Sequence, residues 1–245
     1  MTNLTRVRVL SGNALKLIAC LSMVFDHVGF FLFPKILFFR MLGRIARPLF
    51  SFFIAEGCFY TRNRVRHLTV IAAFGVLMQA VLFFATGMTD LSIFIHFSFS
   101  ILLIDLFDGG VAFLQRAKDG KRFGFFGVIC LLGFVALSAG LHLLCLKTGY
   151  FYANYGFQGI MCPVLLYLAK RYGGRFAFPL ELLLLAGDVL LLAWYWSQAF
   201  QLFGLVAVVL LLFYNGTRGK YNLKYFFYVF YPLHLVIIAA IAALV

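Results

Sequence analysis

Long apolar stretches alternate with short polar segments along the whole chain. A helix needs about 20 apolar residues to cross the hydrocarbon layer of a bilayer, and only helices and closed barrels satisfy their backbone hydrogen bonds there. The sequence lacks the alternating ten-residue pattern of barrel strands, so it predicts an all-α, polytopic transmembrane helix bundle. Nine spans are expected, near residues 14–33, 38–60, 67–86, 91–107, 124–146, 157–169, 177–193, 198–214 and 225–244. The stretch 157–169 is short and holds Gly159 and Pro163, which leaves open whether it spans fully, breaks or re-enters.

The positions of the basic residues predict the orientation of these spans. Sixteen of the 21 Lys and Arg residues fall in alternate connections, at residues 6–16, 62–66, 116–122, 170–175 and 218–224. Only Lys35 and Lys147 fall in the other connections. Because cytoplasmic connections carry the excess of Lys and Arg, the N-terminus is expected inside and the C-terminus outside. This placement accounts for the net charge of +13 without a nucleic-acid partner.

Composition indicates that lipid surrounds most of the chain. The sequence is 64% hydrophobic and only 12% charged, whereas an ordinary globular protein is roughly a quarter charged. A single transmembrane domain over residues 1–245 is therefore expected, with the lipid bilayer as its main partner. The five cysteines show no metal-binding spacing, so no metal is expected, and a disulfide between Cys145 and Cys162 is left open. Aromatic residues cluster at two proposed outer boundaries, at residues 150–155 and 194–196.

Ionisable residues inside the first two spans are the strongest functional signal. The first span carries Asp26 and His27, and it lacks a small-residue cleavage site, so it is interpreted as a retained span rather than a signal peptide. The second span carries Arg40, Arg44 and Arg47, spaced so that one face of a continuous helix presents all three. A charged side chain at the bilayer centre costs at least about 2.5–3.5 kcal/mol on insertion scales. These groups are therefore expected to face the interior of the bundle, where His27 and the three arginines would line one water-accessible chamber.

Depth along the spans predicts which of these groups meet. Asp26 and Arg44 lie in the outer halves of two antiparallel neighbours, so an Asp26–Arg44 ion pair is expected. Polar residues at similar depth on four other spans are Gln79, His96, Asp188 and His234. Each group also has a structural interpretation: helix-bridging pairs for the buried residues, topology signals for Arg62, Arg64 and Arg66, and a solvated loop for Asp105 and Asp108.

Four segments of the chain resemble the TraX family of membrane proteins. They read LKLIACLSMVFDHVGFFLFP, LGRIARPLFSFFIAEGCFYTRNR, NYGFQGIMCPVLLYL and KYFFYVFYPLHL, and the resemblance extends from about residue 13 to the end of the chain. TraX is known for acetylating the amino terminus of conjugative pilin, and its family is similar to the transmembrane acyltransferase superfamily. The resemblance implies an enzyme of the bacterial inner membrane that transfers an acetyl group from cytoplasmic acetyl-CoA to an amine or hydroxyl of a protein or glycan acceptor.

The resemblance also implies roles for individual residues. His27 matches the histidine considered catalytic in the first span and would act as general base, with Asp26 as its acidic neighbour. Arg44, Pro48, Glu56, Thr61 and Arg62 match the second-span motif, whereas Ser92 stands where an Asn would be expected. Contacts to the substrate are expected from Arg44, Arg47, Glu56, His96 and His234. The phosphates of acetyl-CoA are expected to bind Arg62, Arg64, Arg116, Lys121 and Arg122.

Two other classes of function fit the same residues. Buried Asp, His and Arg also mark proton-coupled transporters, although the inverted halves with paired broken helices of such proteins are not visible in the sequence. A non-catalytic pilus or fimbrial assembly factor would use the buried charges only to hold helices together. In that case changing His27 would leave function intact, while changing Asp26 or Arg44 would reduce stability.

Overall fold

The structure, a computed structural model, describes residues 8–87, 91–147 and 155–244, and within these ranges every regular element is helical. The expectation of an all-α fold is confirmed. The α-helices are α1 (Gly12–Phe31), α2 (Leu37–Gly43), α3 (Ala46–Tyr60), α4 (Arg64–Thr86), α5 (Ile93–Gln115), α6 (Lys121–Lys147), α7 (Gly156–Tyr172), α8 (Ala177–Tyr195), α9 (Leu205–Leu212) and α10 (Lys224–Ala242). Short 3-10 helices occur at η2 (Ala117–Asp119), η4 (Gly174–Phe176) and η5 (Ala199–Gly204).

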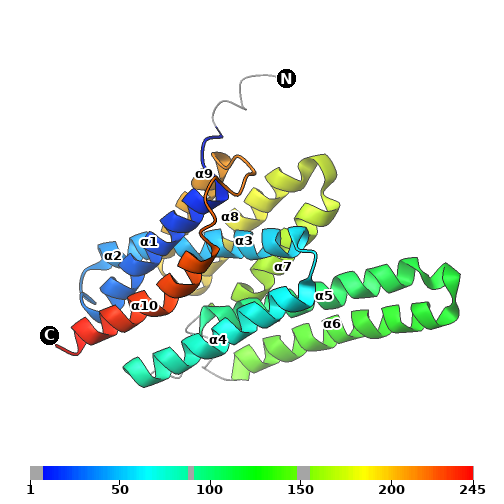
Figure 1. The fold of residues 1–245 in the computed structure, drawn as a ribbon, viewed down its shortest axis with the longest axis horizontal. Coiled ribbons are helices and arrows are strands. Elements are labelled where there is room, and N and C mark those ends of the chain that lie inside the picture. Colours follow the sequence, from blue (N-terminus) through cyan, green and yellow to red (C-terminus); the bar gives the residue numbers. More distant parts are fainter. Residues whose placement is uncertain (1–7, 88–90, 148–154, 245) are drawn as a thin grey trace.

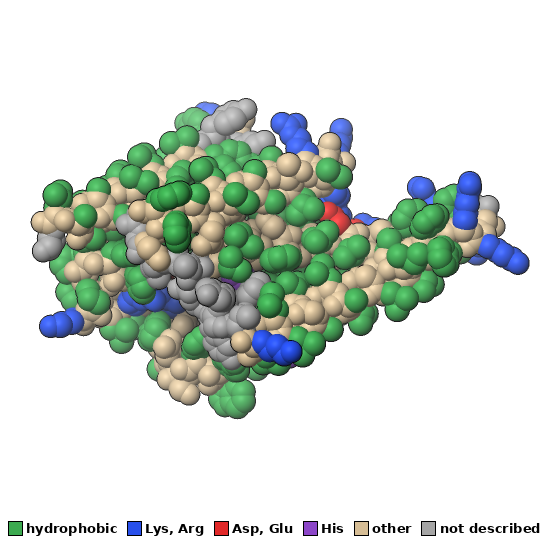
Figure 2. Space-filling view, turned by 90° about the horizontal axis from the view of Figure 1, so that it is seen from below, with side chains coloured by type: hydrophobic (Ala, Val, Ile, Leu, Met, Phe, Trp, Pro, Cys, Tyr) green, Lys and Arg blue, Asp and Glu red, His purple; other side chains and the backbone are tan. Residues whose placement is uncertain are grey.

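Five of these helical segments are long and apolar enough to cross a membrane, which makes the chain a membrane protein by length and composition. They are Gly12–Phe31, Arg64–Phe84, Ile93–Gln115, Lys121–Lys147 and Gly174–Tyr195, and shorter apolar helices occupy Ala199–Leu212 and Phe226–Ala242. Hydrophobic side chains spread over the face shown in Figure 2, while Lys and Arg side chains are few, with several at the tip of the narrow end and others scattered around the outline. An outer surface of this kind suits a lipid environment.

The helices form an elongated bundle from which one hairpin extends (Figure 1). Helix α1 packs against α2, α3 and α10, and α3 packs against α7 and α5. Helices α5 and α6 pair along their length, and their connection lies at the end of an arm that projects beyond the neighbouring helices. Polar caps define two of the helix starts: Ser11 Oγ accepts from the Ala14 N–H at 3.3 Å, and Asn63 Oδ1 accepts from the Arg66 N–H at 2.8 Å.

The expected helix at 38–60 is interrupted at Arg44 and Ile45, which separates α2 from α3. The backbone N–H groups of these two residues bond to carbonyls three residues earlier, at 3.1 and 3.4 Å, which tightens the chain there. Pro48 contributes to the break, because in a regular helix its ring would clash with the carbonyl group four residues earlier, which is that of Arg44. The prediction that Arg40, Arg44 and Arg47 share one face of a continuous helix is therefore wrong.

Two other boundaries differ from the expectation. Helix α5 continues to Gln115, so Asp105 and Asp108 lie on a helix and not in a solvated loop. The uncertain stretch near 157–169 forms one continuous helix, α7, with Pro163 inside it. Cys145 and Cys162 are both free and buried, so the disulfide left open by the sequence is not formed in this structure.

Candidate functional site

Asp26 on α1 lies between two arginines of the second span. Its Oδ1 is 3.1 Å from Arg40 Nη1, and it forms a closer ion pair with Arg44 Nη2. The predicted Asp26–Arg44 pair is confirmed. The backbone makes this approach possible at Gly43, where an added Cβ would overlap the Asp26 side chain. Small residues allow such close helix contacts inside membranes.

Arg47 takes a different carboxylate, because it lies on α3 beyond the break. Its Nη1 is 2.8 Å from Asp188 Oδ2 and its Nη2 donates to Asp188 Oδ1 at 3.0 Å, a two-pronged contact with both side chains largely buried. Gln158 donates to the Asp188 backbone carbonyl at 2.7 Å, which links α7 to α8. We refer to Asp26, Arg40, Arg44, Arg47 and Asp188 together as the Asp26 cluster. In it three guanidinium groups face two carboxylates.

Tyr155 connects the two halves of the Asp26 cluster. Arg44 Nη1 donates to its hydroxyl at 2.8 Å, and the Arg47 guanidinium lies 4.6 Å from the centre of its ring. Tyr155 precedes α7 with φ of 73°, a left-handed backbone conformation that is uncommon for a bulky residue. Such conformations are retained where the surroundings determine them. Here two arginines hold the phenol ring in place.

The His27 side chain points towards a different helix from the one that the Asp26 side chain faces. Its Nδ1 lies 2.9 Å from Nε2 of His234 on α10, and His234 Nδ1 lies 2.9 Å from the Phe230 carbonyl oxygen. A carbonyl only accepts, so His234 carries its proton on Nδ1 and its Nε2 is an acceptor. His27 must then donate from Nδ1, which leaves the lone pair on His27 Nε2. The chain of contacts assigns one tautomer to each ring.

The imidazole and the guanidinium groups therefore lie on different sides of α1. Consecutive residues of a helix point about 100° apart, and Asp26 faces α2 and the break that follows it, while His27 faces α10. The expectation that His27 and the arginines line one shared chamber is not met by any contact among the described residues.

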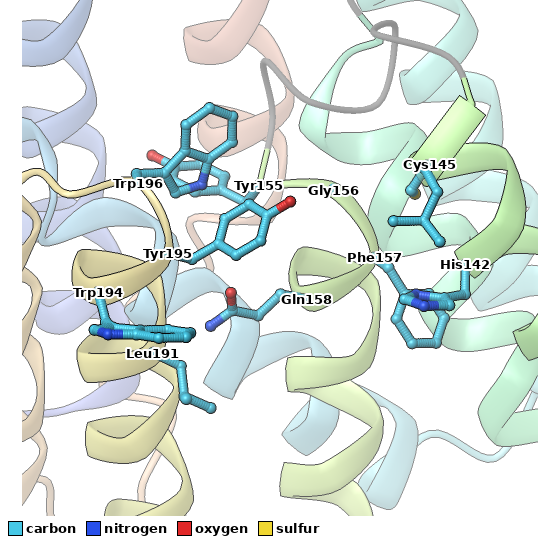
Figure 3. A pocket seen from close by; sticks show the side chains of 11 residues that line it. His142, Cys145, Tyr155, Gly156, Phe157, Gln158, Leu191, Trp194, Tyr195 and Trp196 are labelled. Carbon is cyan, nitrogen blue, oxygen red and sulfur yellow. The ribbon is translucent and has the colours of Figure 1, made fainter.

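A cavity of about 390 Å³ borders the Asp26 cluster at Tyr155 and Gln158 (Figure 3). Its other walls are His142 and Cys145 of α6, Phe157 of α7, and an aromatic run at the end of α8, Trp194, Tyr195 and Trp196. Tyr155, from one of the aromatic clusters expected at the outer boundary, thus shares a cavity with the other cluster, at residues 194–196. Residues 150–154 of the first cluster lie outside the described part of the chain. We call this space the aromatic cavity.

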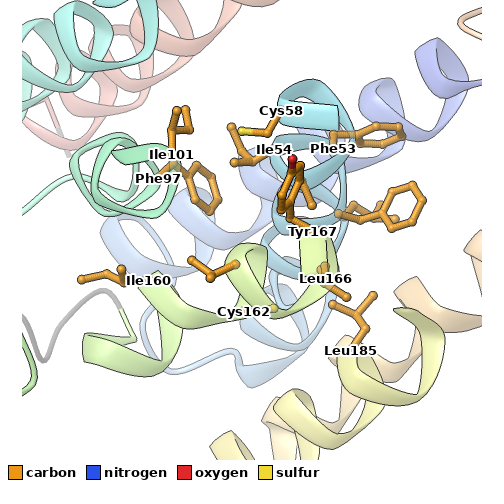
Figure 4. Close-up of a cluster of buried hydrophobic side chains, with 14 of the residues drawn as sticks. Phe53, Ile54, Cys58, Phe97, Ile101, Ile160, Cys162, Leu166, Tyr167 and Leu185 are labelled. Atoms are coloured by element: carbon orange, nitrogen blue, oxygen red, sulfur yellow. The ribbon is translucent and has the colours of Figure 1, made fainter. Parts of the chain in front are cut away.

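A hydrophobic core fills the bundle between the Asp26 cluster and the opposite end of α3 (Figure 4). It contains Phe52 and Ile54 of α3, Ile101 of α5, and Ile160 and Leu166 of α7, all almost completely buried. His96 is fully buried in the same region, and its Nδ1 donates to the Ser92 carbonyl at 3.2 Å. This contact lies within α5 and its N-cap, whereas the structural interpretation expects a bond between helices.

Glu56 lies at the other end of α3 from Arg47. Its carboxylate is 3.5 Å from Lys170 Nζ and accepts from the Tyr214 hydroxyl at 3.0 Å. Lys170 also lies 3.7 Å from Glu181. The structure thus separates Glu56 from the other expected substrate contacts and places it in a second polar group. The sequence did not single out Lys170, Tyr214 or Glu181 for this role.

The five residues expected to bind coenzyme phosphates do not form one site. Arg64 is already engaged, because it donates to Asp105 and Asp108 at 2.9 Å each and to the Tyr167 hydroxyl at 2.7 Å. Arg62 is exposed at the end of α3. The other three are exposed near the end of the α5–α6 arm: Arg116, Lys121 and Arg122. Figure 1 shows this arm projecting away from the start of α4, where Arg64 lies.

Comparison with known proteins assigns the chain to a family. The family model described as TraX protein matches residues 11–242. The chain belongs to the TraX family. A probable fimbrial assembly protein FimC of serogroup H1 from Dichelobacter nodosus is 27% identical to this TraX-family chain, over 94% of the chain and 95% of that protein. An uncharacterised protein of Rickettsia prowazekii is 37% identical over 27% of the chain and 25% of its own length. No solved structure gives a significant match.

The residues matched by the TraX model include two of the segments that resemble the family, and both contribute to the site. Asp26 and His27 come from the first, and Arg44 and Arg47 from the second. In the part of the chain that the structure describes, no group of three or more His, Cys, Asp or Glu side chains is arranged to hold a metal ion.

Proposed function

We propose that this TraX-family protein is an integral membrane acyltransferase of the bacterial inner membrane. It takes an acetyl group from cytoplasmic acetyl-CoA and transfers it to an amine or hydroxyl of a protein or glycan acceptor. The proposal includes nine passes, with α2 and α3 counted as one pass and η5 and α9 as another, the N-terminus inside and the C-terminus outside. The distribution of Lys and Arg along the chain supports this orientation.

The proposal rests on one observation, the chain of hydrogen bonds that runs from the Phe230 carbonyl through His234 to His27 and fixes the tautomer of each ring. It leaves His27 Nε2 with a lone pair, and Nε2 makes no hydrogen bond among the described residues. A neutral imidazole nitrogen of this kind is the usual general base of acyl transfer. His234 is a positioning residue, because it holds His27 Nδ1 in the protonated form.

The transfer proceeds by attack on the thioester carbonyl carbon. The acceptor nitrogen or oxygen forms the new bond as its proton moves to His27 Nε2. Breakage of the carbon–sulfur bond then releases the coenzyme thiolate, which takes the proton from His27. The products are the acetylated acceptor and free coenzyme A. The two positive charges of Arg40 and Arg44 exceed the single negative charge of Asp26 beside them, and in this proposal the excess favours the developing oxyanion.

In this proposal the acceptor binds in the aromatic cavity, and its reacting group extends past α1 to His27, which faces α10 and does not line the cavity. That cavity ends against Tyr155 and Gln158, which hold Arg44 and the Asp188 backbone. Aromatic walls suit a partly apolar acceptor segment at the membrane boundary. The acceptor therefore approaches from the side opposite to the cytoplasmic donor.

The test measures transfer from radiolabelled acetyl-CoA into the protein and glycan fractions of membrane vesicles that contain the purified protein. His27→Gln is expected to reduce label incorporation by about 100-fold or more, as removal of a general base does. His234→Gln is expected to reduce it by about 10- to 100-fold, the usual effect of losing a group that orients a ring. His67→Gln on α4 is the matched control and is expected to retain activity. Full transfer by a folded His27→Gln protein would contradict the proposal.

A second function, a non-catalytic fimbrial assembly factor, is favoured by two observations. The relative from Dichelobacter nodosus is named a probable fimbrial assembly protein, and each of Arg40, Arg44 and Arg47 is already paired with a carboxylate. The two functions differ in their dependence on His27. Two results together would favour the assembly factor. A host strain with folded His27→Gln protein would assemble normal numbers of fimbriae, and neither the wild-type nor the His27→Gln protein would transfer label.

A further inference from the structure

Two neighbouring cavities open at the Glu56 end of the bundle. Their volumes are about 300 and 400 Å³, and they share Glu56, Tyr60, Tyr214 and Gly216 as lining residues. Because they share these walls, they form two parts of one depression. We call it the Glu56 basin. In the proposed orientation it faces the cytoplasm.

Positive charge exceeds negative charge in the Glu56 basin. The lining residues described include four cations and two carboxylates: Arg8, Lys16, Lys170 and Arg218, with Glu56 and Glu181. Lys170 lies near both carboxylates, at 3.5 and 3.7 Å, and so offsets much of their charge. The remaining cations leave the basin with a net positive charge.

Three of the four cations have no carboxylate within ion-pair distance among the described residues. The Lys16 ammonium lies 4.7 Å from the centre of the Phe53 ring, and the Arg8 guanidinium lies 5.0 Å from that of Phe178. Contact with a ring face leaves N–H donors free for an anion. The Arg218 contact is with an amide, since its Nη2 donates to Asn222 Oδ1 at 2.7 Å.

The wall of the Glu56 basin is held in place by backbone hydrogen bonds. The segment before α1 pairs with the segment after α9: the Leu10 N–H donates to the Phe213 carbonyl at 2.9 Å, and the Gly12 N–H donates to the Thr217 carbonyl at 2.8 Å. The Tyr214 hydroxyl is fixed by its hydrogen bond to Glu56. Lys16 and Arg218 therefore come from two segments that are locked together, which reduces the cost of ordering them around a ligand.

We propose that the Glu56 basin binds the phosphates of a nucleoside diphosphate, with Lys16 and Arg218 as the main cationic contacts and Tyr60 as a ring on which the base stacks. Under the proposed acyltransferase function, on which this inference rests, that nucleotide is the adenosine diphosphate part of coenzyme A. The assignment replaces the expected contacts to Arg64, whose donors are occupied by Asp105, Asp108 and Tyr167.

The register of α1 supports this assignment. Lys16 and His27 are eleven residues apart, so they lie about 20° from each other around the helix and about 16 Å apart along it. A nucleotide held at Lys16 therefore points its pantetheine arm along the face of α1 that carries His27. Cys20 and Met23 occupy that face between them, and both are buried. The arm must therefore displace these two side chains to bring the thioester to the base.

The test measures ligand binding by the full-length protein in nanodiscs of phosphatidylcholine, with coenzyme A, ADP and inorganic pyrophosphate as separate probes and the thermal midpoint as the readout. Lys16→Gln and Arg218→Gln are each expected to weaken coenzyme A binding by about tenfold or more, as the loss of a charged hydrogen bond does. Lys16→Arg is expected to restore most of it. Lys220→Gln is the matched control, because Lys220 is exposed on the same segment as Arg218 but lines neither cavity.

The outcomes separate this inference from the proposed function. If coenzyme A binds with unchanged affinity to Lys16→Gln and Arg218→Gln, the basin is not the nucleotide site, whatever His27→Gln does to acetyl transfer. If the wild-type protein binds no coenzyme A or ADP, both proposals fail. A response of the wild-type protein to phosphatidylglycerol in the nanodisc but not to ADP, abolished by Lys16→Gln, would assign the basin to a lipid phosphate and overturn the nucleotide assignment.

Discussion

The buried pair of Arg47 and Asp188 is the part of the site whose energy can be stated most directly. Asp188→Asn keeps the shape of the side chain and removes its charge. Arg47 then loses its partner, because Asp188 is the carboxylate within ion-pair distance of it among the described residues. With only 4% of the Arg47 side chain exposed, solvent cannot replace that partner.

The expected loss follows from the surroundings of Arg47. Removing one partner of a buried ion pair costs about 3–5 kcal/mol. The Tyr155 ring, 4.6 Å from the guanidinium, remains and attracts the charge, so the lower end, about 3 kcal/mol, is expected for Asp188→Asn. At about 2–4 °C per kcal/mol for a protein of this size, the thermal midpoint should fall by about 6–12 °C.

The assay is thermal unfolding of the purified protein in detergent, followed by tryptophan fluorescence. Arg47→Met is expected to lose about as much as Asp188→Asn, and the double variant is expected to lose less than the two losses added together. Arg66→Met is the control, since Arg66 is exposed on α4, and it should change stability by less than about 0.5 kcal/mol. A stable Asp188→Asn protein, or a double variant whose loss equals the sum, would refute the reasoning.

Two further predictions concern the contacts around Arg44. Gly43→Ala should lower the free energy of unfolding by about 1–3 kcal/mol, because the new Cβ overlaps Asp26 and forces α2 away from α1. The control is Gly187→Ala on α8, where the added Cβ meets nothing within 4 Å and the thermal midpoint should not fall. Equal midpoints for the two variants would contradict the close contact. Tyr155→Phe should cost about 1.5–3 kcal/mol in chemical unfolding through loss of the 2.8 Å hydrogen bond from Arg44, whereas unchanged stability would show that this bond contributes nothing.

Part of the candidate site could be predicted from local sequence. Asp26 and Arg44 are joined by a short connection between two apolar segments, so the helices had to be antiparallel neighbours and the charges had to meet. The cost of burying an unpaired charge made an anionic partner for each arginine necessary. It did not determine which carboxylate each arginine takes. The break at Arg44 decided that, because it turned Arg47 towards Asp188 on α8.

The other contacts join segments far apart in the sequence. His27 and His234 are 207 positions apart, and Arg64 meets carboxylates more than 40 positions away. Hydropathy places each residue at a depth in the bilayer but does not define the rotation of its helix. A difference of 100° in that rotation exchanges the facing residue for its neighbour. The expectation that His27 faces the arginines failed for this reason.

The sequence alone determined that lipid surrounds the helices and that the fold is an all-α bundle. The reason is that the free energy of transferring a side chain into lipid is a local property, which sums along a segment. It also determined that charges inside the bundle need partners. Only the tertiary structure decided which groups meet: the tautomer chain from His234 to His27, the position of Tyr155 between two guanidinium groups, and the Glu56 basin. These depend on how distant helices pack, and packing depends on the shapes of all the side chains at once.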